Sequence, residues 1–406
     1  MRLFCLLLTL MLGFITGCSN PLPPPPTTSS AQGSVATNPT PALTAANTTL
    51  ATATPAAIPT ETTPPTPVET AAEADPTDQG LNLLVDVSGE VQLKRVAWPG
   101  YRQTGFGVGL RRGDLLKLAA GAEAVILCDN LTLWRVPGGP APAGLNGCPR
   151  PEAPALIRRG VKIAGTRGGD PNVPYIISPR STKLLNPLPV LHWNAPPGAA
   201  SYTVELRGGE ITWQQEAVTT PSLAYPGEPP LEPGVTYLLV VTDDRGRSSQ
   251  DEGARGLGFS ILPEVEAEKI IQQRDQIIGL ELSEPARQYA LAQYDASQGL
   301  IAEAIERFEQ LVASGSEEAA VHQALADLYA QIGLWLLAEA RYTTAIALAD
   351  QQQNLEILAA GRARLGEVKL KLGKTAEASD LLTQAKNDYE TLGEIERAAE
   401  LNQLLE

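Results

Sequence analysis

The stretch QYALAQYDASQGLIAEAIERFEQL, residues 288–311, decides the fold of the C-terminal third of this chain. Apolar and small residues recur in it every three or four positions on both sides of Gly299, which predicts two amphipathic helices joined by a glycine turn. The same arrangement returns around Gly333 and Gly373, at intervals of 34 and then 40 residues. The sequence therefore predicts an array of helical hairpins.

Corresponding positions of the three hairpins carry matching residues. The tight pair of the first helix is Leu291-Ala292, Leu325-Ala326 and Leu365-Gly366, and the small position of the second helix is Ala304, Ala338 and Ala378. The period and these positions resemble the tetratricopeptide repeat family. That resemblance implies an all-α solenoid over residues 263–406, with longer helices in the third repeat and a capping helix at each end, near Val265 to Ile278 and from Glu394 to Leu405.

The concave face of such arrays is lined by residues of each first helix. By phase, the predicted groove residues are Tyr289, Gln293, Gln323, Asp327 and Glu367. The resemblance implies a protein partner on this face. Some relatives clamp the terminal carboxylate of a peptide with Lys, Arg and Asn at such positions, of which only Arg364 is present here, so acidic peptide tails are not expected to bind.

Negative charge is concentrated in the predicted helical array. The whole chain has a net charge of −15, and residues 263–406 hold 25 acidic against 12 basic residues. An acidic surface argues against nucleic acid, whose phosphates require basic side chains. The charge favours a basic or neutral partner, although acidic helices can also serve solubility alone.

The N-terminus has the pattern of an export signal. Arg2 precedes about a dozen mostly apolar residues, a run too short to span a membrane, where about 20 are needed. Residues 15–18, Ile-Thr-Gly-Cys, resemble the lipobox of bacterial lipoproteins. The resemblance implies that residues 1–17 are a signal peptide and that Cys18 receives the lipid that anchors the protein to a membrane; the alternative is an ordinary secretory signal. We expect a cell-envelope location facing the periplasm or the cell exterior.

A disordered tether is predicted for residues 18–80. This segment is rich in Pro, Thr and Ala, and from residue 20 to about residue 80 it has no Lys, Arg or aromatic residue, so it cannot form a core. It would extend the rest of the chain away from the lipid.

Two all-β modules are predicted between the tether and the array. In residues 81–150, Gly89-Glu90-Val91 and the later Gly113-Asp114 step resemble the periplasmic sensor domain of FecR-type regulators. Cys128 and Cys148 are the remaining cysteines of an exported chain, which favours a disulfide over two buried free thiols. The motif does not include the loop between these cysteines.

The second module covers residues 175–262, after a linker at residues 151–174. Here Leu231-Glu232-Pro233-Gly234 and the strand that begins with Val235-Thr236-Tyr237 resemble the tyrosine corner of fibronectin type III domains, and Trp193 is the expected core tryptophan. The resemblance implies a seven-stranded β-sandwich.

No catalytic, metal or cofactor site is recognisable in the sequence. The two histidines, His192 and His322, lie far apart and lack other ligands at suitable spacing. The favoured function is therefore a lipid-anchored extracytoplasmic scaffold, not an enzyme, that binds protein partners through the array. The alternatives are an envelope sensor acting through the FecR-like domain and a carbohydrate-active enzyme, for which no segment remains large enough.

Overall fold

The computed structural model describes residues 80–139, 141–160, 162–164, 170–252 and 257–405. The predicted signal peptide, Cys18 and the predicted tether up to residue 79 lie outside these residues. Among the described helices, none has the length and apolar composition needed to cross a membrane.

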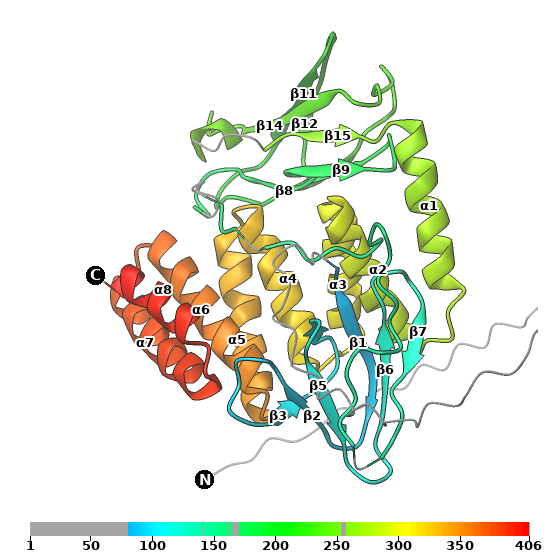
Figure 1. The fold of residues 1–406 in the computed structure, drawn as a ribbon. Coiled ribbons are helices and arrows are strands. Elements are labelled where there is room, and N and C mark those ends of the chain that lie inside the picture. The colour runs from blue at the N-terminus through cyan, green and yellow to red at the C-terminus, as the bar shows by residue number, and fades with distance from the viewer. Residues whose placement is uncertain (1–79, 140, 161, 165–169, 253–256, 406) are drawn as a thin grey trace, which may run out of the picture. The chain divides into compact units, whose positions relative to one another are not determined.

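The first module consists of two small antiparallel sheets (Figure 1). Its strands are β1 (Asn82–Ser88), β2 (Val91–Lys94), β3 (Arg102–Thr104), β4 (Gly109–Leu110), β5 (Leu115–Leu118), β6 (Glu123–Leu127) and β7 (Leu133–Arg135). One sheet has the order β4-β1-β6-β7 and the other β3-β2-β5. Cys128 and Cys148 form a disulfide with a Cα–Cα distance of 5.4 Å, which ties the loop after β7 to the end of β6. We refer to this module as the N-terminal β domain.

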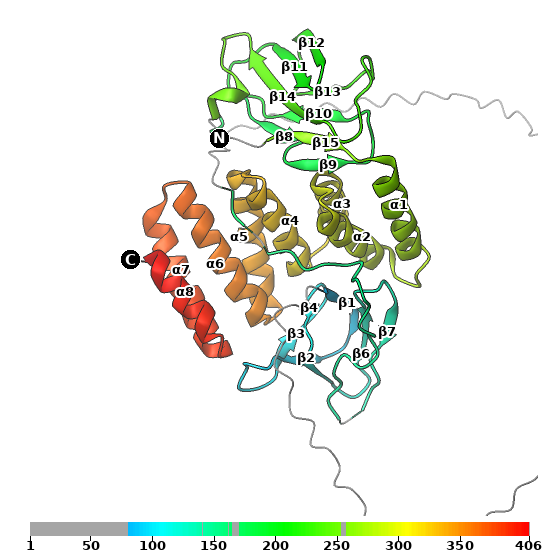
Figure 2. The same ribbon diagram turned by 45° about the horizontal axis from the view of Figure 1, so that its top comes forward.

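The second module is a β-sandwich, whose strands Figure 2 labels. They are β8 (Ile176–Ser178), β9 (Thr182–Leu184), β10 (Val190–Trp193), β11 (Tyr202–Gly208), β12 (Ile211–Val218), β13 (Ser222–Ala224), β14 (Thr236–Asp243) and β15 (Phe259–Ile261). The sheets have the orders β13-β10-β8 and β12-β11-β14-β15-β9. A short 3₁₀ helix, Ser249–Glu252, follows β14.

The core of the sandwich forms around the aromatic residues expected from the sequence. Trp193 is buried, and so is Tyr237, whose hydroxyl accepts a hydrogen bond of 2.7 Å from the backbone N–H of Glu232. This bond closes the turn before β14 as a tyrosine corner does. The sequence predicts seven strands, and the described residues of the sandwich form eight. The additional strand is β9, which lies at the edge of the larger sheet and pairs in parallel with β15.

The C-terminal residues form helical repeats that resemble the tetratricopeptide solenoid. The helices are α1 (Glu264–Ile278), α2 (Glu284–Gln298), α3 (Ile301–Ala313), α4 (Ala319–Gln331), α5 (Trp335–Gln351), α6 (Leu355–Lys371), α7 (Thr375–Leu392) and α8 (Ile395–Leu405). Helices α2 to α7 pack as three hairpins, and α1 and α8 flank them (Figure 1). As expected, the helices of the third hairpin are longer, with 17 and 18 residues against 15 and 13 in the first.

The glycines and small residues act as the repeat pattern predicts. Gly299, Gly333 and Gly373 each follow the first helix of a hairpin with a φ between 75° and 86°, a conformation that glycine adopts at little cost. A Cβ atom on Gly366 would lie 2.7 Å from Cγ of Leu382. The close approach of α6 and α7 therefore requires glycine at that position.

The N-terminal β domain and the helical array share one hydrophobic core. A single cluster of buried side chains runs from Leu81 in the β domain to Leu401 in α8, whereas the sandwich has a separate core around Trp193 and Tyr237. The apolar surface of the first β module is therefore buried against the helices.

Candidate functional site: a cavity between the N-terminal β domain and the helical array

A loop of the N-terminal β domain contacts the predicted groove at the first hairpin. Tyr289 of α2 is only 2% exposed, and its hydroxyl donates a hydrogen bond of 2.9 Å to the carbonyl oxygen of Gly107. Its ring packs against that of Phe106, with 4.8 Å between the ring centroids. Tyr289 therefore anchors the β domain to the array.

A second contact joins the β domain to the third hairpin through a buried arginine. Arg95, which follows β2, forms ion pairs with Asp114 of its own domain and with Glu356 in the first turn of α6, both at 2.5 Å. Its guanidinium also lies over the ring of Trp98, whose indole N–H donates to Glu394 at 3.0 Å. The β domain thus contacts the array at both α2 and α6.

The charge of Arg95 depends on these carboxylates. Burial alone would lower the pKa of Arg95, but the negative charges of Glu356 and Asp114 outweigh burial and raise it above its ordinary value. Arg95 is 4% exposed, so loss of either partner would leave a charge with poor access to water.

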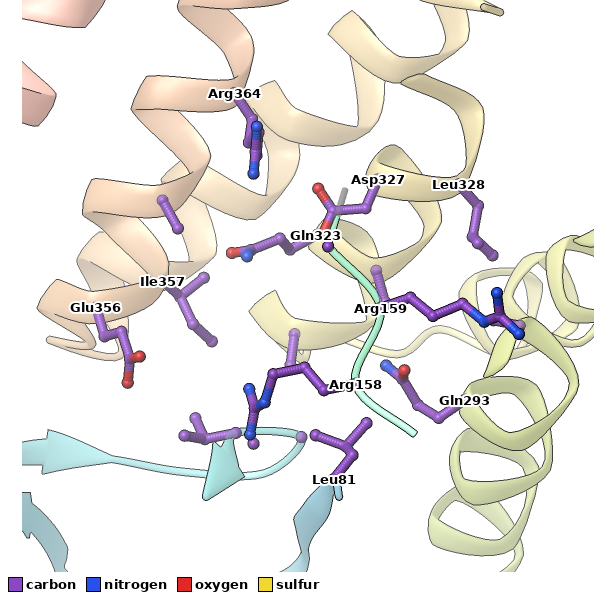
Figure 3. Close-up of a pocket in the computed structure, with 18 of the residues that line it drawn as sticks. Leu81, Arg158, Arg159, Gln293, Gln323, Asp327, Leu328, Glu356, Ile357 and Arg364 are labelled. Atoms are coloured by element: carbon purple, nitrogen blue, oxygen red, sulfur yellow. The ribbon is translucent and has the colours of Figure 1, made fainter. Parts of the chain in front are cut away.

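The described part of the predicted linker also follows the array. Leu156 is fully buried, and the Arg159 guanidinium donates a 2.6 Å hydrogen bond to the carbonyl oxygen of Ser297 in α2. Further along, the backbone N–H of Ala164 donates to the carbonyl oxygen of Ala330 in α4 at 3.1 Å. Figure 3 shows the extended segment with Arg158 and Arg159 pointing to opposite sides. The segment therefore forms part of the site.

These three parts of the chain line a partly open cavity of about 600 Å³. Six arginines line it: Arg95, Arg111, Arg158, Arg159, Arg364 and Arg397. Four carboxylates also line it: Asp327, Glu356, Glu367 and Glu400. A volume of this size and a wall with several polar groups are typical of ligand sites.

All five predicted groove residues line this cavity. Gln293 donates to the Tyr289 hydroxyl at 3.0 Å, and Glu367 pairs with Arg364 at 3.1 Å. Gln323 and Asp327 both lie on α4 (Figure 3). Sequence reasoning missed the arginines of the β domain and linker. Leu156 and Ile157, an apolar pair inside a Pro/Gly-rich segment, were the one available signal that the linker packs against something.

Asp327 is the most perturbed acid in the wall of the cavity. Burial raises its pKa to about 6, although the hydrogen bond from the Tyr342 hydroxyl and the charge of Arg364 favour the ionised form. Glu367 also faces this group and opposes its ionisation. At neutral pH the protein therefore holds an ionised carboxylate at a free-energy cost.

Asp327→Asn is expected to stabilise the protein at neutral pH and to have little effect in acid. Because the pKa of Asp327 is higher in the folded protein, protonation of its carboxyl stabilises the fold. This contribution to the free energy of unfolding is complete below the ordinary pKa of 3.8 and is lost as the pH rises through about 6. Each unit of pKa difference is equivalent to about 1.4 kcal/mol, so the rise from 3.8 to about 6 corresponds to a gain of about 3 kcal/mol at about pH 7.5. Urea unfolding of both proteins between about pH 4 and pH 8 checks this. Parallel stability profiles would contradict it.

The histidines lie outside this cavity. His192 on β10 is exposed, and His322 on α4 is buried with Nε2 3.1 Å from the carbonyl oxygen of Ser316. Within the described ranges, no group of three or more His, Cys, Asp or Glu side chains is placed to hold a metal ion. The site therefore offers charged and polar groups for binding.

Comparison with known proteins gives similarities to solved helical-repeat structures. No family model matches the chain. No curated protein matches it. MamA is 17% identical over 35% of this chain and 92% of that chain, with a TM-score of 0.25. A kinesin light chain of Podosopora anserina with nearly identical TPR-like repeats is 22% identical over 35% of this chain and 84% of its own chain, with a TM-score of 0.27. BtubC from P. vanneervenii is 16% identical over 35% of this chain and 71% of its own chain, also with a TM-score of 0.27. Scores of this size assign no partner and no activity to this chain.

Proposed function

We propose that this protein is a lipid-anchored extracytoplasmic scaffold that binds a protein partner in the cavity between its N-terminal β domain and its helical array. The cavity carries the proposal, because it places all five predicted groove residues around one space of about 600 Å³. Binding, and not catalysis, is the proposed role. The β-sandwich contacts the array outside the cavity. The backbone N–H of Lys183 in β9 donates a 3.0 Å hydrogen bond to the carbonyl oxygen of Gly299, in the turn between α2 and α3.

A substitution that fills the cavity tests this function. Ala360 of α6 lines the cavity and is half-buried, so the side chain in Ala360→Trp would occupy the space of a ligand. The matched control is Thr383→Trp on α7, at an exposed position that does not line the cavity. Crosslinked affinity purification from detergent-solubilised membranes is expected to recover the partner with the wild type and with Thr383→Trp, and to lose it with Ala360→Trp. Equal recovery with all three, at equal thermal midpoints, would rule out the cavity as the partner site.

The lipid anchor rests on the sequence of residues 1–18 and needs its own test. Burial of acyl chains contributes about 0.8 kcal/mol per methylene group, so a lipid-modified Cys18 should hold the protein in the membrane fraction through a high-salt wash. We expect the wild type to require detergent for release and Cys18→Ser to lack the lipid and lose this requirement. Salt release of the wild type would contradict the anchor.

An envelope sensor is the second candidate. The ion pair between Arg95 and Glu356 favours it, because this contact couples the FecR-like β domain to the array. A sensor of this kind would need a transmembrane partner bound by the β domain. Recovery of such a partner with Ala360→Trp, but not after substitution of exposed β-domain residues, would support this function over the scaffold.

A further inference from the structure

The cavity contains an arginine whose charge no neighbouring group neutralises directly. Arg111 follows β4, is half-buried and lines the cavity. Its backbone N–H donates to Asp114 at 2.8 Å, but within the described part of the chain its guanidinium forms neither a hydrogen bond nor an ion pair. A buried or half-buried guanidinium without a partner has lost hydration without a replacement.

Three further arginines, Arg95, Arg158 and Arg397, increase the positive charge around Arg111. Burial, together with the charges of Arg111 and Arg95, lowers the pKa of Arg158 to about 10, against the opposing effect of Glu356 and Asp114. Burial also lowers the pKa of Arg111, and Arg95 and Arg397 add to this effect. The guanidinium groups therefore repel one another more than the nearby carboxylates compensate.

The carboxylates closest to this cluster are already engaged. Asp114 and Glu356 both bind Arg95 at 2.5 Å. On the array side, Glu367 pairs with Arg364 at 3.1 Å. Among the described residues, Arg111 has no such pair, and the guanidinium of Arg158 donates only to the carbonyl oxygen of Leu110, at 3.0 Å. Both are therefore available to an incoming carboxylate.

The polar groups beside the cluster suit a peptide backbone. Gln323 of α4 lines the cavity, and its buried Oε1 accepts no hydrogen bond within the described part of the chain. A backbone N–H of a bound segment would satisfy this acceptor. A cavity of about 600 Å³ lies within the range of roughly 300 to 1,000 Å³ that holds compact ligands, which is room for a few residues of a peptide.

We propose that the cavity binds an internal acidic segment of a protein partner, with a side-chain carboxylate of that segment received by Arg111 and Arg158. This inference rests on the proposed scaffold function and names the chemistry of its partner. The expectation that acidic peptide tails do not bind concerned a terminal carboxylate and is a separate one. The proposal reverses the expectation of a basic or neutral partner. That expectation considered the helices alone, whereas these arginines come from the β domain and the linker.

The test is a calorimetric titration of the full-length protein in detergent with a defined probe. The probe is an acetylated and amidated hexapeptide of alternating alanine and glutamate, and its matched control has glutamine in place of glutamate. Hydrogen bonds to charged groups contribute about 1.5 to 3 kcal/mol, which is a factor of about ten or more in affinity. We expect at least about tenfold weaker binding of the glutamine peptide, and a similar loss for the acidic peptide with Arg111→Gln.

Arg135→Gln is the matched control variant, because Arg135 on β7 is exposed and does not line the cavity. It should bind the acidic peptide as the wild type does. Thermal midpoints of both variants must match the wild type; if Arg111→Gln is unstable, Arg158→Gln takes its place. Equal binding of the two peptides, or full binding by a folded Arg111→Gln, would overturn the proposal.

A third probe shows whether the cavity recognises a peptide or any small carboxylate. Glutarate carries the same chemistry without a peptide backbone, and binding of glutarate with no binding of the hexapeptide would overturn the peptide assignment. Partner recovery that Ala360→Trp abolishes, together with no binding of the acidic peptide, would refute this inference and leave the scaffold function standing. Unchanged recovery with Ala360→Trp would refute the scaffold function whatever the peptide does.

Discussion

Arg95→Ala is expected to destabilise the protein by about 3 to 5 kcal/mol, the usual cost of breaking a buried ion pair by removal of one partner. The substitution leaves Asp114 buried without its cation and removes the charge that holds Glu356 of α6 against the β domain. It also removes the guanidinium that covers Trp98 at 5.5 Å. We expect a lower midpoint of chemical unfolding and faster hydrogen exchange in β2 and in the first turn of α6.

A double-mutant cycle shows whether this loss belongs to the contact between the β domain and the array. Arg95→Ala and Glu356→Ala remove the same contact, so the double variant should lose clearly less stability than the two single losses added together. Additive losses would mean that the ion pair does not couple the two parts. Arg135→Ala, an exposed arginine on β7, is the control and should have little effect.

Gly107→Ala is expected to separate the β-domain loop from the first hairpin. Gly107 has a φ of 78°, and an added Cβ would lie 2.4 Å from Cβ of Ala320 and 2.8 Å from the hydroxyl oxygen of Tyr289. A side chain in the left-handed region costs about 1 to 2 kcal/mol, and overpacking adds about 1 to 3 kcal/mol. We expect a lower thermal midpoint and loss of exchange protection in α2 and α4, because the loop must move away.

Gly105→Ala is the matched control in the same loop. No atom lies within 4 Å of a Cβ added at Gly105, and its backbone does not require glycine. This variant should keep the wild-type midpoint and exchange pattern. Equal behaviour of the two variants would show that the loop does not pack on Tyr289 as described.

The helical array was predictable because its signal is repeated. Each hairpin requires a small residue where its helices cross and a glycine where its first helix ends, and these needs recur at fixed spacing in the sequence. Ala304 and Ala338 are fully buried, and Gly333 has a φ of 77°, as such positions require. The same phase brought Gln293, Gln323 and Asp327 to one cavity.

The chemistry of the cavity was not predictable from the repeats. Arg95 and Glu356 are 261 positions apart, and nothing in the sequence near either residue identifies the other. Arg111 begins the β-turn after β4, and Arg158 lies in a Pro/Gly-rich stretch; charged residues in such loops are usually solvated. Their role arises only because the β domain packs against the helices. A prediction made one module at a time therefore gave an acidic helical array, whereas the cavity is lined by six arginines and four carboxylates.

The measurement that tests this account most directly is site-specific photocrosslinking in cells from a photoreactive residue at Ala360, in the wall of the cavity. We predict a crosslink to a partner protein from this position and none from exposed Thr383 on α7. We also predict that Arg111→Gln, in the same labelled protein, weakens the crosslink. Crosslinks from Thr383 with none from Ala360 would contradict the claim that the cavity between the N-terminal β domain and the helical array is the binding site.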